Sequence, residues 1–388
     1  MSTPPGSVTV ANWQDAPHNR WAFGHLDALV PSVLVPRGAG PQLPLPAARR
    51  ELDDLPVDGA SRGRTVGALL EATFTDAFLV LHDGRLVYER YDACGGVHQR
   101  HLLMSISKSL CGLAACVLSE EGRLDLATPV DELVPELRLS GFAGATVEHL
   151  LDMTASVAFD EDYDRPDSDA QQQDRVAGWR PRREGDPDDG YAFLAGIQPG
   201  GRHGSALQYC SATTDVLAWV MERASGRRYP QLLSELLWSR IGAEDDGSIT
   251  VDRAGLAFAN AGVSTTARDL ARFGHLVLCG GADGGYRLCA SATVSAIVAG
   301  GDSRLLEGMG FTAEFPHGSY RLHWFVTGND HGVLESRGIH GQYLWLDPSA
   351  RIVIVKLSSV PQALVPGLTA DVHRGFAAIT AALTSPSG

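Results

Sequence analysis

Met104-Ser-Ile-Ser-Lys-Ser-Leu-Cys-Gly112 is the stretch from which the rest of the chain is interpreted. It opens an apolar segment in which residues such as Leu113 and Val117 recur at helical spacing. The segment ends at Gly122, the residue type best able to adopt the left-handed conformation that follows a helix. The sequence therefore predicts a buried helix from Ser105 to Glu121.

Two residues at the start of this predicted helix carry a chemical pattern. Ser105 and Lys108 are three positions apart and so share one helix face, where an ammonium lies within hydrogen-bond reach of the hydroxyl. A serine hydroxyl is a weak nucleophile unless a neighbour takes its proton, and a helix N-terminus favours developing negative charge. A Ser-x-x-Lys pattern also recurs by chance, with Ser105 then a simple helix cap, so further context is required.

That context is Tyr209-Cys-Ser211, about a hundred residues downstream. A second helix is predicted from Ser211 to Ala224, opened by Ser211 and closed by Gly226, so Tyr209 immediately precedes a helix. Its simpler interpretation is a buried tyrosine before a helix cap. Beside Ser-x-x-Lys, however, Tyr209-Cys-Ser211 resembles the Tyr-x-Asn/Ser element that supplies the second proton carrier in one superfamily of serine enzymes.

The chain resembles the 6-aminohexanoate-dimer hydrolases, nylon-oligomer hydrolases with the fold of class C β-lactamases. The resemblance rests on the two elements above and on four further stretches of the chain: Phe258-Ala-Asn-Ala-Gly-Val-Ser264, Gly338-Ile-His-Gly-Gln342, Asn12-Trp-Gln-Asp-Ala-Pro-His-Asn-Arg-Trp-Ala-Phe23 and Val216-Leu-Ala-Trp219. It runs from near residue 12 to about residue 360. It implies an α+β fold of the serine β-lactamase/transpeptidase type, an antiparallel sheet flanked by helices with an inserted, mainly helical subdomain.

The resemblance also implies roles for the catalytic residues. Ser105 is expected to be acylated, and Lys108 to keep Tyr209 poised to take the serine proton and return it to the leaving group. A nearby ammonium favours the phenolate of a tyrosine, whose unperturbed pKa is about 10. The backbone N–H groups of Ser105 and Ile339 are expected to form the oxyanion hole.

Four residues are implied to contact the substrate: Tyr163, Asp174, Asn260 and Trp324. Asp174 would pair with the free ammonium of a linear 6-aminohexanoate dimer, which needs a carboxylate partner when it leaves water. Tyr163 would hydrogen-bond the leaving amide nitrogen. Three of the four have a simpler interpretation that the sequence leaves open: a solvated loop acid for Asp174, a turn for Asn260 and core packing for Trp324.

The third motif of the superfamily, Lys/His-Thr-Gly, is replaced here by Ser336-Arg337-Gly338. A basic residue at the first position helps hold a substrate carboxylate in β-lactamases and D-alanyl-D-alanine peptidases, so Ser336 disfavours both activities. Arg337 could substitute for that basic residue only if its side chain points into the cleft. It should point away from Ser336 because side chains alternate along a strand, but the pattern does not say which side faces the cleft. His340 is interpreted as structural, because Lys108 and Tyr209 already fill the role of base.

The chain is expected to form one catalytic unit over residues 1–388. An α/β subdomain spans about 20–105 plus 255–388, a helical subdomain about 106–254, and an N-terminal arm 1–20. Two β-rich hairpins, Ala77–Tyr91 with Asp83-Gly84 at its turn and Tyr343–Leu357, supply strands from both ends of the chain. The other local predictions are an irregular arm over Pro36–Arg50, a loop over Phe159–Asp169, and helices over Thr146–Met153 and Leu368–Leu383.

Composition narrows the class of partner. The formal net charge of −14 disfavours nucleic acid and anionic membranes, which leaves a small-molecule amide or ester as the expected substrate. Neither a basic-apolar leader nor an apolar span of about 20 residues is present, so we expect a cytoplasmic protein. The six cysteines show no CxxC pair and are expected to be mostly reduced and buried.

No metal or other cofactor is expected in the reaction, because the acids and histidines lack a spacing such as His-Glu-x-x-His. The expected function is a serine hydrolase of linear amides with activity on short esters. A carboxylesterase without amidase activity is the alternative, a β-lactamase or D-alanyl-D-alanine peptidase comes third, and a non-catalytic binder has no reason to keep Ser105, Lys108 and Tyr209. The oligomeric state stays open, with a homodimer as one expectation.

Overall fold

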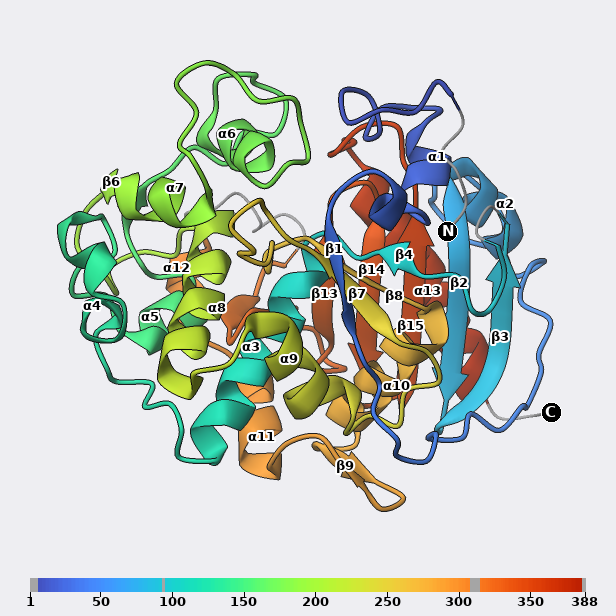
Figure 1. Ribbon diagram of the computed structural model, residues 1–388. Helices are drawn as coiled ribbons and strands as arrows, with labels where there is room; N and C mark the ends of the chain where they lie inside the picture. The colour runs from blue at the N-terminus through green and yellow to red at the C-terminus, as the bar shows by residue number, and fades with distance from the viewer. Residues whose placement is uncertain (1–5, 93–94, 308–314, 386–388) are drawn as a thin grey trace.

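A seven-stranded antiparallel sheet, whose labelled strands lie in the right-hand half of Figure 1, organises the computed structural model, which describes residues 6–92, 95–307 and 315–385. The sheet has the order β11-β12-β13-β14-β15-β2-β3. Its strands are β11 (Ser319–Arg321), β12 (Trp324–Val326), β13 (Leu334–Gly338), β14 (Gln342–Asp347), β15 (Ile352–Ser358), β2 (Thr75–His82) and β3 (Arg85–Tyr91). Cys94 and the first five residues of the predicted N-terminal arm lie outside the described residues.

Strand β2 pairs with β15, which joins the N-terminal and C-terminal parts of the chain in one sheet. Both strands are almost fully buried, because helices cover both faces. Phe78 and Ile354 point to the face covered by α2 (Val66–Ala72) and α13 (Leu368–Thr384). Leu79 and Val355 point to the opposite face, which α10 (Ala267–Leu278) covers. The predicted α+β architecture is confirmed.

The chain between β4 (His101–Leu102) and β7 (Gly247–Thr250) is mainly helical and lies beside the sheet in Figure 1. It contains α3 (Ile106–Glu120), α4 (Val130–Leu133), α5 (Val147–Leu151), α6 (Asp169–Val176), α7 (Gly190–Gly196), α8 (Ser211–Ser225), α9 (Tyr229–Leu233) and a π-helical turn, Ser234–Trp238. Helix α8 packs against α3 and α5, so the apolar helix that begins after Ser105 is enclosed on several sides.

A second antiparallel sheet has the order β1-β7-β8-β4, with β1 at Ser32–Val35 and β8 at Val263–Thr265. Strand β7 falls inside the stretch 106–254 that was assigned to the helical subdomain. It nevertheless pairs with β1 and β8, so the chain returns to sheet structure before residue 255. The period-2 signal of a four-residue strand is too short to locate such a return.

The remaining elements are short. They are α1 (Asn19–Ala22), a 3₁₀ turn at Leu26–Ala28, a second at Pro135–Leu139, β5 (Val157–Ala158), β6 (Gln198–Pro199), β9 (Ala282–Asp283), β10 (Tyr286–Arg287), α11 (Ser291–Ala299) and α12 (Ser303–Glu307). Among the described residues, no helix is both long and apolar enough to cross a membrane.

The local predictions are confirmed at turns and helix ends, where the residue types favour one backbone conformation. Asp83 and Gly84 both have positive φ angles, 52° and 69°, as a tight hairpin between β2 and β3 requires. Gly122 and Gly226 have φ angles of 70° and 69° and follow α3 and α8. The N-terminal arm is packed rather than loose: Trp13 is 1% exposed and donates its indole N–H to the Trp179 carbonyl at 2.6 Å.

Candidate active site

Ser105 lies at the junction between β4 and α3, as the residue that caps the helix. Met104 before it has a φ angle of 49°, an uncommon conformation for a side chain of its size and a feature that concentrates at functional turns. The Lys108 ammonium donates a hydrogen bond to Ser105 Oγ at 2.9 Å. The serine hydroxyl and the ammonium are therefore in contact, as predicted. Both side chains are buried, and this strengthens their interaction.

A second acceptor fixes the Lys108 ammonium, namely the backbone carbonyl of Asn260 at 3.1 Å. Asn260 is held in turn by Asp215, which accepts its backbone N–H and its side-chain amide, both at 2.9 Å. Gln173 also donates to Asp215, at 2.6 Å. Burial raises the pKa of Asp215 to about 7, while these donors and the Lys108 ammonium oppose the rise. Sequence reasoning missed Asp215, because it sits inside an amphipathic helix like any polar residue.

Tyr209 lies next to the Lys108 ammonium, which is 5.1 Å from the centroid of the tyrosine ring. The ring stacks on Phe325 with centroids 6.2 Å apart and meets Tyr320 edge to face at 6.2 Å. These aromatic contacts fix the ring plane at the N-terminus of α8, close to α3. Ser105, Lys108 and Tyr209 are thus brought together as the motifs predicted.

The position of Ile339 depends on Gly338 at the end of β13. A Cβ atom at Gly338 would lie 2.7 Å from Met104 Cβ and 2.9 Å from the Ser105 nitrogen, so only glycine allows the strand to come this close to the serine turn. The following residue is Ile339, which lines the cleft together with Ser105, so this close approach brings the backbone N–H groups of both residues to the same part of the cleft. In the described loops, turns and side-chain contacts, neither N–H has an acceptor, as an oxyanion hole requires.

The cleft around Ser105 has two lobes. The smaller, about 240 Å³, is lined by polar side chains that include Gln14, Asp174, Arg180 and Asn260. The larger, about 490 Å³, is mainly apolar and is lined by residues that include Tyr209, Phe325, Arg337, Tyr343, Leu364 and Val365. Ser105, Tyr163, Ile339 and Ala363 line both lobes. The serine therefore lies where a polar and an apolar compartment meet, with a combined volume typical of small-molecule sites.

Asp174 projects from α6 into the smaller lobe. Its Oδ2 accepts from Arg180 Nε at 3.0 Å and from Gln14 Nε2 at 3.2 Å. Its Oδ1 has no hydrogen-bond donor among the described residues, so one oxygen remains open to the cleft. Burial raises the pKa of Asp174, and the Arg180 guanidinium opposes the rise. Arg180 was not among the predicted site residues.

Tyr163 lines both lobes, and Glu161 holds it there: the tyrosine hydroxyl donates to Glu161 Oε1 at 2.8 Å. Burial, and secondly the Glu161 charge, raise the pKa of Tyr163 well above its usual value, so its hydroxyl stays protonated. Glu161 also accepts the backbone N–H of Ser211 at 2.8 Å and its hydroxyl. Ser211 therefore contacts a glutamate rather than capping α8, and Cys210 is the cap residue. Nothing in the acidic run distinguished Glu161 from its neighbours.

The prediction that Trp324 lines the cleft is wrong. Its side chain is fully buried, belongs to the largest core cluster and stacks on Phe273 of α10 at 6.2 Å. It occupies the face of β12 that points away from the cleft, whereas its neighbour Phe325 lines the larger lobe. The resemblance therefore pointed to a strand that does line the cleft, through Phe325, but Trp324 lies on the other face of that strand.

Ser336 and Arg337, which replace the first two residues of the third motif, point to opposite sides of β13. Ser336 is buried, with its hydroxyl 2.6 Å from that of Ser109 on α3. Arg337 faces the larger lobe and stacks its guanidinium over Phe325, 4.9 Å from the ring centroid. The side chains alternate as expected for a strand, and Arg337 is the one that points into the cleft.

His340 supports the loop that carries Ile339. Its Nδ1 bonds the Val360 carbonyl at 2.7 Å, its backbone N–H donates to Ala363, and its φ angle is 62°. Burial lowers the pKa of His340 to about 4, so the ring is neutral at neutral pH. It supports the loop that carries Ile339 and has a basicity too low for a general base, in agreement with its interpretation as structural.

His340→Gln is expected to flatten the acid limb of the stability profile. Because the folded pKa lies below the unfolded value of about 6.5, the stability due to neutral His340 is fully present above about pH 6.5 and is lost as the pH falls toward about 4, a total of about 3 kcal/mol. Urea unfolding at several pH values measures the free energy of unfolding. His331→Gln, at a half-exposed histidine, is the control. An unchanged acid limb in His340→Gln would contradict this assignment.

Comparison with known proteins places this geometry in a family. The profile of the Beta-lactamase family matches residues 64–378. A 6-aminohexanoate-dimer hydrolase of Paenarthrobacter ureafaciens is 47% identical over 381 residues, which cover 96% of this chain and 95% of the relative.

Two solved structures extend the comparison. A Bacillus anthracis protein provisionally named 6-aminohexanoate-dimer hydrolase superposes with a TM-score of 0.90 at 29% identity, over 100% of both chains. A family VIII carboxylesterase superposes with a TM-score of 0.58 at 16% identity, over 81% of this chain and 96% of that one, which shows a shared fold. The resemblance inferred from the motifs is confirmed. The chain belongs to the Beta-lactamase family and is a serine hydrolase of that family.

Proposed function

We propose that this chain hydrolyses linear amides of the 6-aminohexanoate-dimer type through an acyl-enzyme on Ser105, and short-chain esters as secondary substrates. The observation that carries the proposal is a carboxylate, Asp174, with one oxygen open to the polar lobe of a cleft whose two lobes meet at Ser105. An amide with an amino group at one end and a carboxylate at the other matches that division. The name of the 47% identical relative supports the same substrate class.

The substrate is expected to lie with its amino-acyl half in the smaller lobe. Its ammonium pairs with Asp174 Oδ1, which offsets the loss of hydration in the cleft. The leaving half extends into the larger lobe, where apolar side chains contact its methylene groups and the Arg337 guanidinium meets its carboxylate. The scissile carbonyl then lies between the lobes at Ser105.

The reaction proceeds by two proton transfers through Tyr209. Tyr209 accepts the proton of Ser105 as its Oγ attacks the carbonyl carbon, and the Ser105 and Ile339 N–H groups stabilise the tetrahedral oxyanion. Tyr209 then donates the proton to the leaving amine as the C–N bond breaks. Water hydrolyses the acyl-enzyme by the same steps in reverse order. Lys108, held by the Asn260 carbonyl, keeps a positive charge at hydrogen-bond distance from the Ser105 hydroxyl and 5.1 Å from the centroid of the Tyr209 ring.

Two other functions have weaker support from the residues of the cleft. A carboxylesterase without amidase activity needs the same catalytic residues but no ammonium site, and the pairing of Arg180 with Asp174 is compatible with it. A β-lactamase or D-alanyl-D-alanine peptidase is disfavoured, because Ser336 takes the place of the basic residue at the motif's first position and is buried against Ser109. The basic group in the cleft is instead Arg337, at the next position of β13, with its guanidinium stacked on Phe325.

Purified enzyme is to be assayed side by side on 6-aminohexanoate linear dimer, a short p-nitrophenyl ester and a chromogenic cephalosporin. We expect turnover of the dimer and of the ester, both lost in Ser105→Ala. Ester cleavage alone would replace the proposal with the carboxylesterase. Rapid cephalosporin hydrolysis without dimer cleavage would overturn it in favour of a β-lactamase.

Asp174→Ala is expected to raise KM for the linear dimer by about tenfold or more, because a charged ammonium loses its partner, while p-nitrophenyl ester hydrolysis changes less than about twofold. Asp164→Ala is the matched control, because Asp164 is an exposed acid that lines the same lobe. Steady-state kinetics on both substrates separate the effects. Equal losses on dimer and ester would mean that Asp174 only supports α6 through Arg180 and Gln14.

A further inference from the structure

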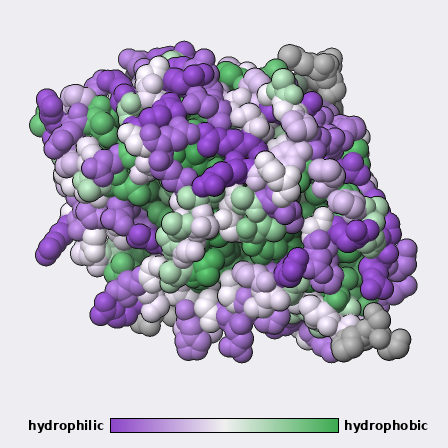
Figure 2. All heavy atoms as spheres, turned by 90° about the horizontal axis from the view of Figure 1, so that it is seen from below, coloured by the Kyte–Doolittle hydropathy of each residue, from purple (hydrophilic) through white to green (hydrophobic). Residues whose placement is uncertain are grey.

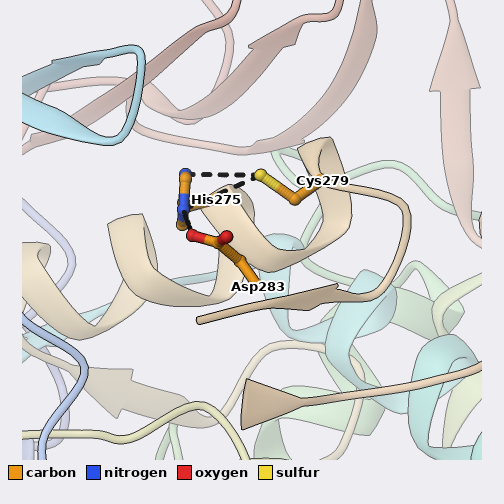
Figure 3. A group of neighbouring side chains, drawn as sticks. All are labelled: His275, Cys279 and Asp283. Atoms are coloured by element: carbon orange, nitrogen blue, oxygen red, sulfur yellow. Dashed lines mark hydrogen bonds and ion pairs between the residues drawn. The ribbon is translucent and has the colours of Figure 1, made fainter. Parts of the chain in front are cut away.

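Three metal-binding side chains converge at the C-terminal end of α10, outside the cleft (Figure 3). His275 and Cys279 are four residues apart on one face of the helix, and Asp283 ends β9, the first strand of the hairpin that follows. Their donor atoms all lie within 4.8 Å of one another. His275 Nε2 is 2.8 Å from Asp283 Oδ2 and 3.7 Å from Cys279 Sγ. Figure 3 shows the Cys279 and Asp283 side chains both directed toward the His275 ring.

The imidazole of this cluster is held in place by the hairpin between β2 and β3. A Cβ atom at Gly84 would lie 2.9 Å from His275 Cε1, so the glycine backbone packs directly against the ring. The His275 side chain is 9% exposed, whereas that of Asp283 is 49% exposed and Cys279 is exposed. The cluster therefore combines one fixed ligand with two that open to solvent, which leaves room for a water molecule as a fourth ligand.

We propose that His275, Cys279 and Asp283 form a Zn²⁺ site. Thiolate, imidazole and carboxylate together suit a borderline-soft divalent cation and not Mg²⁺ or Ca²⁺, which take oxygen ligands. With tetrahedral zinc bonds the S···N and N···O separations would be about 3.5 Å and about 3.4 Å. Cys279 Sγ is 3.7 Å from Nε2 but also 3.8 Å from Nδ1, so the thiol must rotate toward the Nε2 side of the ring to share a metal with it. The Asp283 carboxylate must withdraw by about 0.6 Å, a small shift for a short hairpin with Gly284 and Gly285 at its turn.

The charges of the ligands match the charge of Zn²⁺ at this site. The Cys279 thiol releases its proton to solvent as the Zn–S bond forms, and the proton on His275 Nε2 is replaced by the metal and retained on Nδ1. One thiolate and one carboxylate neutralise the dication. Arg351, whose charge acts on Cys279, is itself paired with Asp83 at 2.6 Å and so adds little net repulsion.

The site would tie the β9–β10 hairpin to α10 and so act on stability. In Figure 1 this hairpin lies at the opposite end of the molecule from α6, which carries Asp174. Figure 2 views the molecule from that lower side, where hydrophilic side chains surround an apolar centre. Bound Zn²⁺ should therefore raise the melting temperature and leave hydrolysis unchanged.

The test uses full-length protein without a histidine tag, titrated with Co²⁺ and Zn²⁺. Co²⁺ should give one equivalent of a thiolate-to-cobalt charge-transfer band, which Zn²⁺ displaces. Cys279→Ser should abolish the band, and Asp283→Asn should weaken Co²⁺ binding by at least about tenfold. His331→Gln is the matched control, because His331 pairs with Asp347 at 2.8 Å in the same way but is not part of the cluster.

A second measurement follows Cys279 directly. The other described cysteines are buried, so in a Cys94→Ser background the rate of alkylation by iodoacetamide reports on Cys279. Zn²⁺ should slow alkylation at least about tenfold. Absence of the charge-transfer band, or alkylation at the same rate with and without Zn²⁺, would overturn the proposal and leave a simple hydrogen bond between His275 and Asp283. An effect of His331→Gln equal to that of Asp283→Asn would also overturn it.

Discussion

Ser105→Ala is expected to lower kcat/KM by at least about 10⁴-fold on every substrate while the protein stays folded. The reason is that no acyl-enzyme can form without Oγ, and the oxyanion donors alone supply only a small part of the acceleration. The folded state should lose about 1 kcal/mol, because Lys108 keeps the Asn260 carbonyl and the Tyr209 ring as partners. Kinetics and thermal unfolding on the same preparation measure both quantities.

Ser107→Ala is the control for this prediction. Ser107 belongs to the same Ser-x-Ser-Lys motif, but its hydroxyl accepts the Val263 N–H at 3.2 Å and is buried away from the cleft. It should retain activity with a similar small loss of stability. Mass spectrometry after incubation with a p-nitrophenyl ester should locate the acyl group on the peptide that contains Ser105. A labelled Ser105→Ala protein, or an inactive Ser107→Ala, would contradict the assignment of the nucleophile.

The residues that the sequence predicted well are those whose role is local. Ser105 and Lys108 are related by one helical turn, and Asp83-Gly84 and Gly226 by turn and cap conformations, so spacing along the chain was enough to place them. Ile339 was assigned through the resemblance of Gly338-Ile-His-Gly-Gln342 to the family, and the close approach of Gly338 to the serine turn is what brings it there. Such constraints survive folding because they depend on a few neighbouring φ and ψ angles.

The residues that the sequence did not predict act across long separations. Asp215 holds Asn260, Arg180 and Gln14 share Asp174, and Glu161 joins Tyr163 to α8. Each is a common polar side chain whose role depends on which elements meet in space. Trp324 failed for a related reason: a three-residue strand has no pattern long enough to say which of its faces lies toward the cleft.

Tyr209→Phe is expected to slow acylation by about 10² to 10⁴-fold, because phenylalanine keeps the ring contacts with Phe325 and Tyr320 but carries no proton. Tyr320→Phe is the matched control, since Tyr320 is a buried tyrosine that touches the same ring and has no proposed part in the reaction. Stopped-flow measurement of the first turnover separates acylation from later steps. A similar loss in Tyr320→Phe would mean that the aromatic cluster, and not the hydroxyl of Tyr209, limits the rate.

A comparison of two leaving groups, an amine and p-nitrophenolate, tests the role of Tyr209 more directly. An amine departs only when its nitrogen receives a proton, whereas p-nitrophenolate leaves without one. If Tyr209 returns the serine proton to the leaving group, Tyr209→Phe must slow cleavage of the linear dimer by a larger factor than cleavage of the p-nitrophenyl ester. If Tyr209 only removes the serine proton, the two factors are equal, because attack by Oγ is common to both substrates. The ratio of the two losses therefore distinguishes a single proton transfer from the two that we propose, and it does so within one variant, where differences in folding cancel.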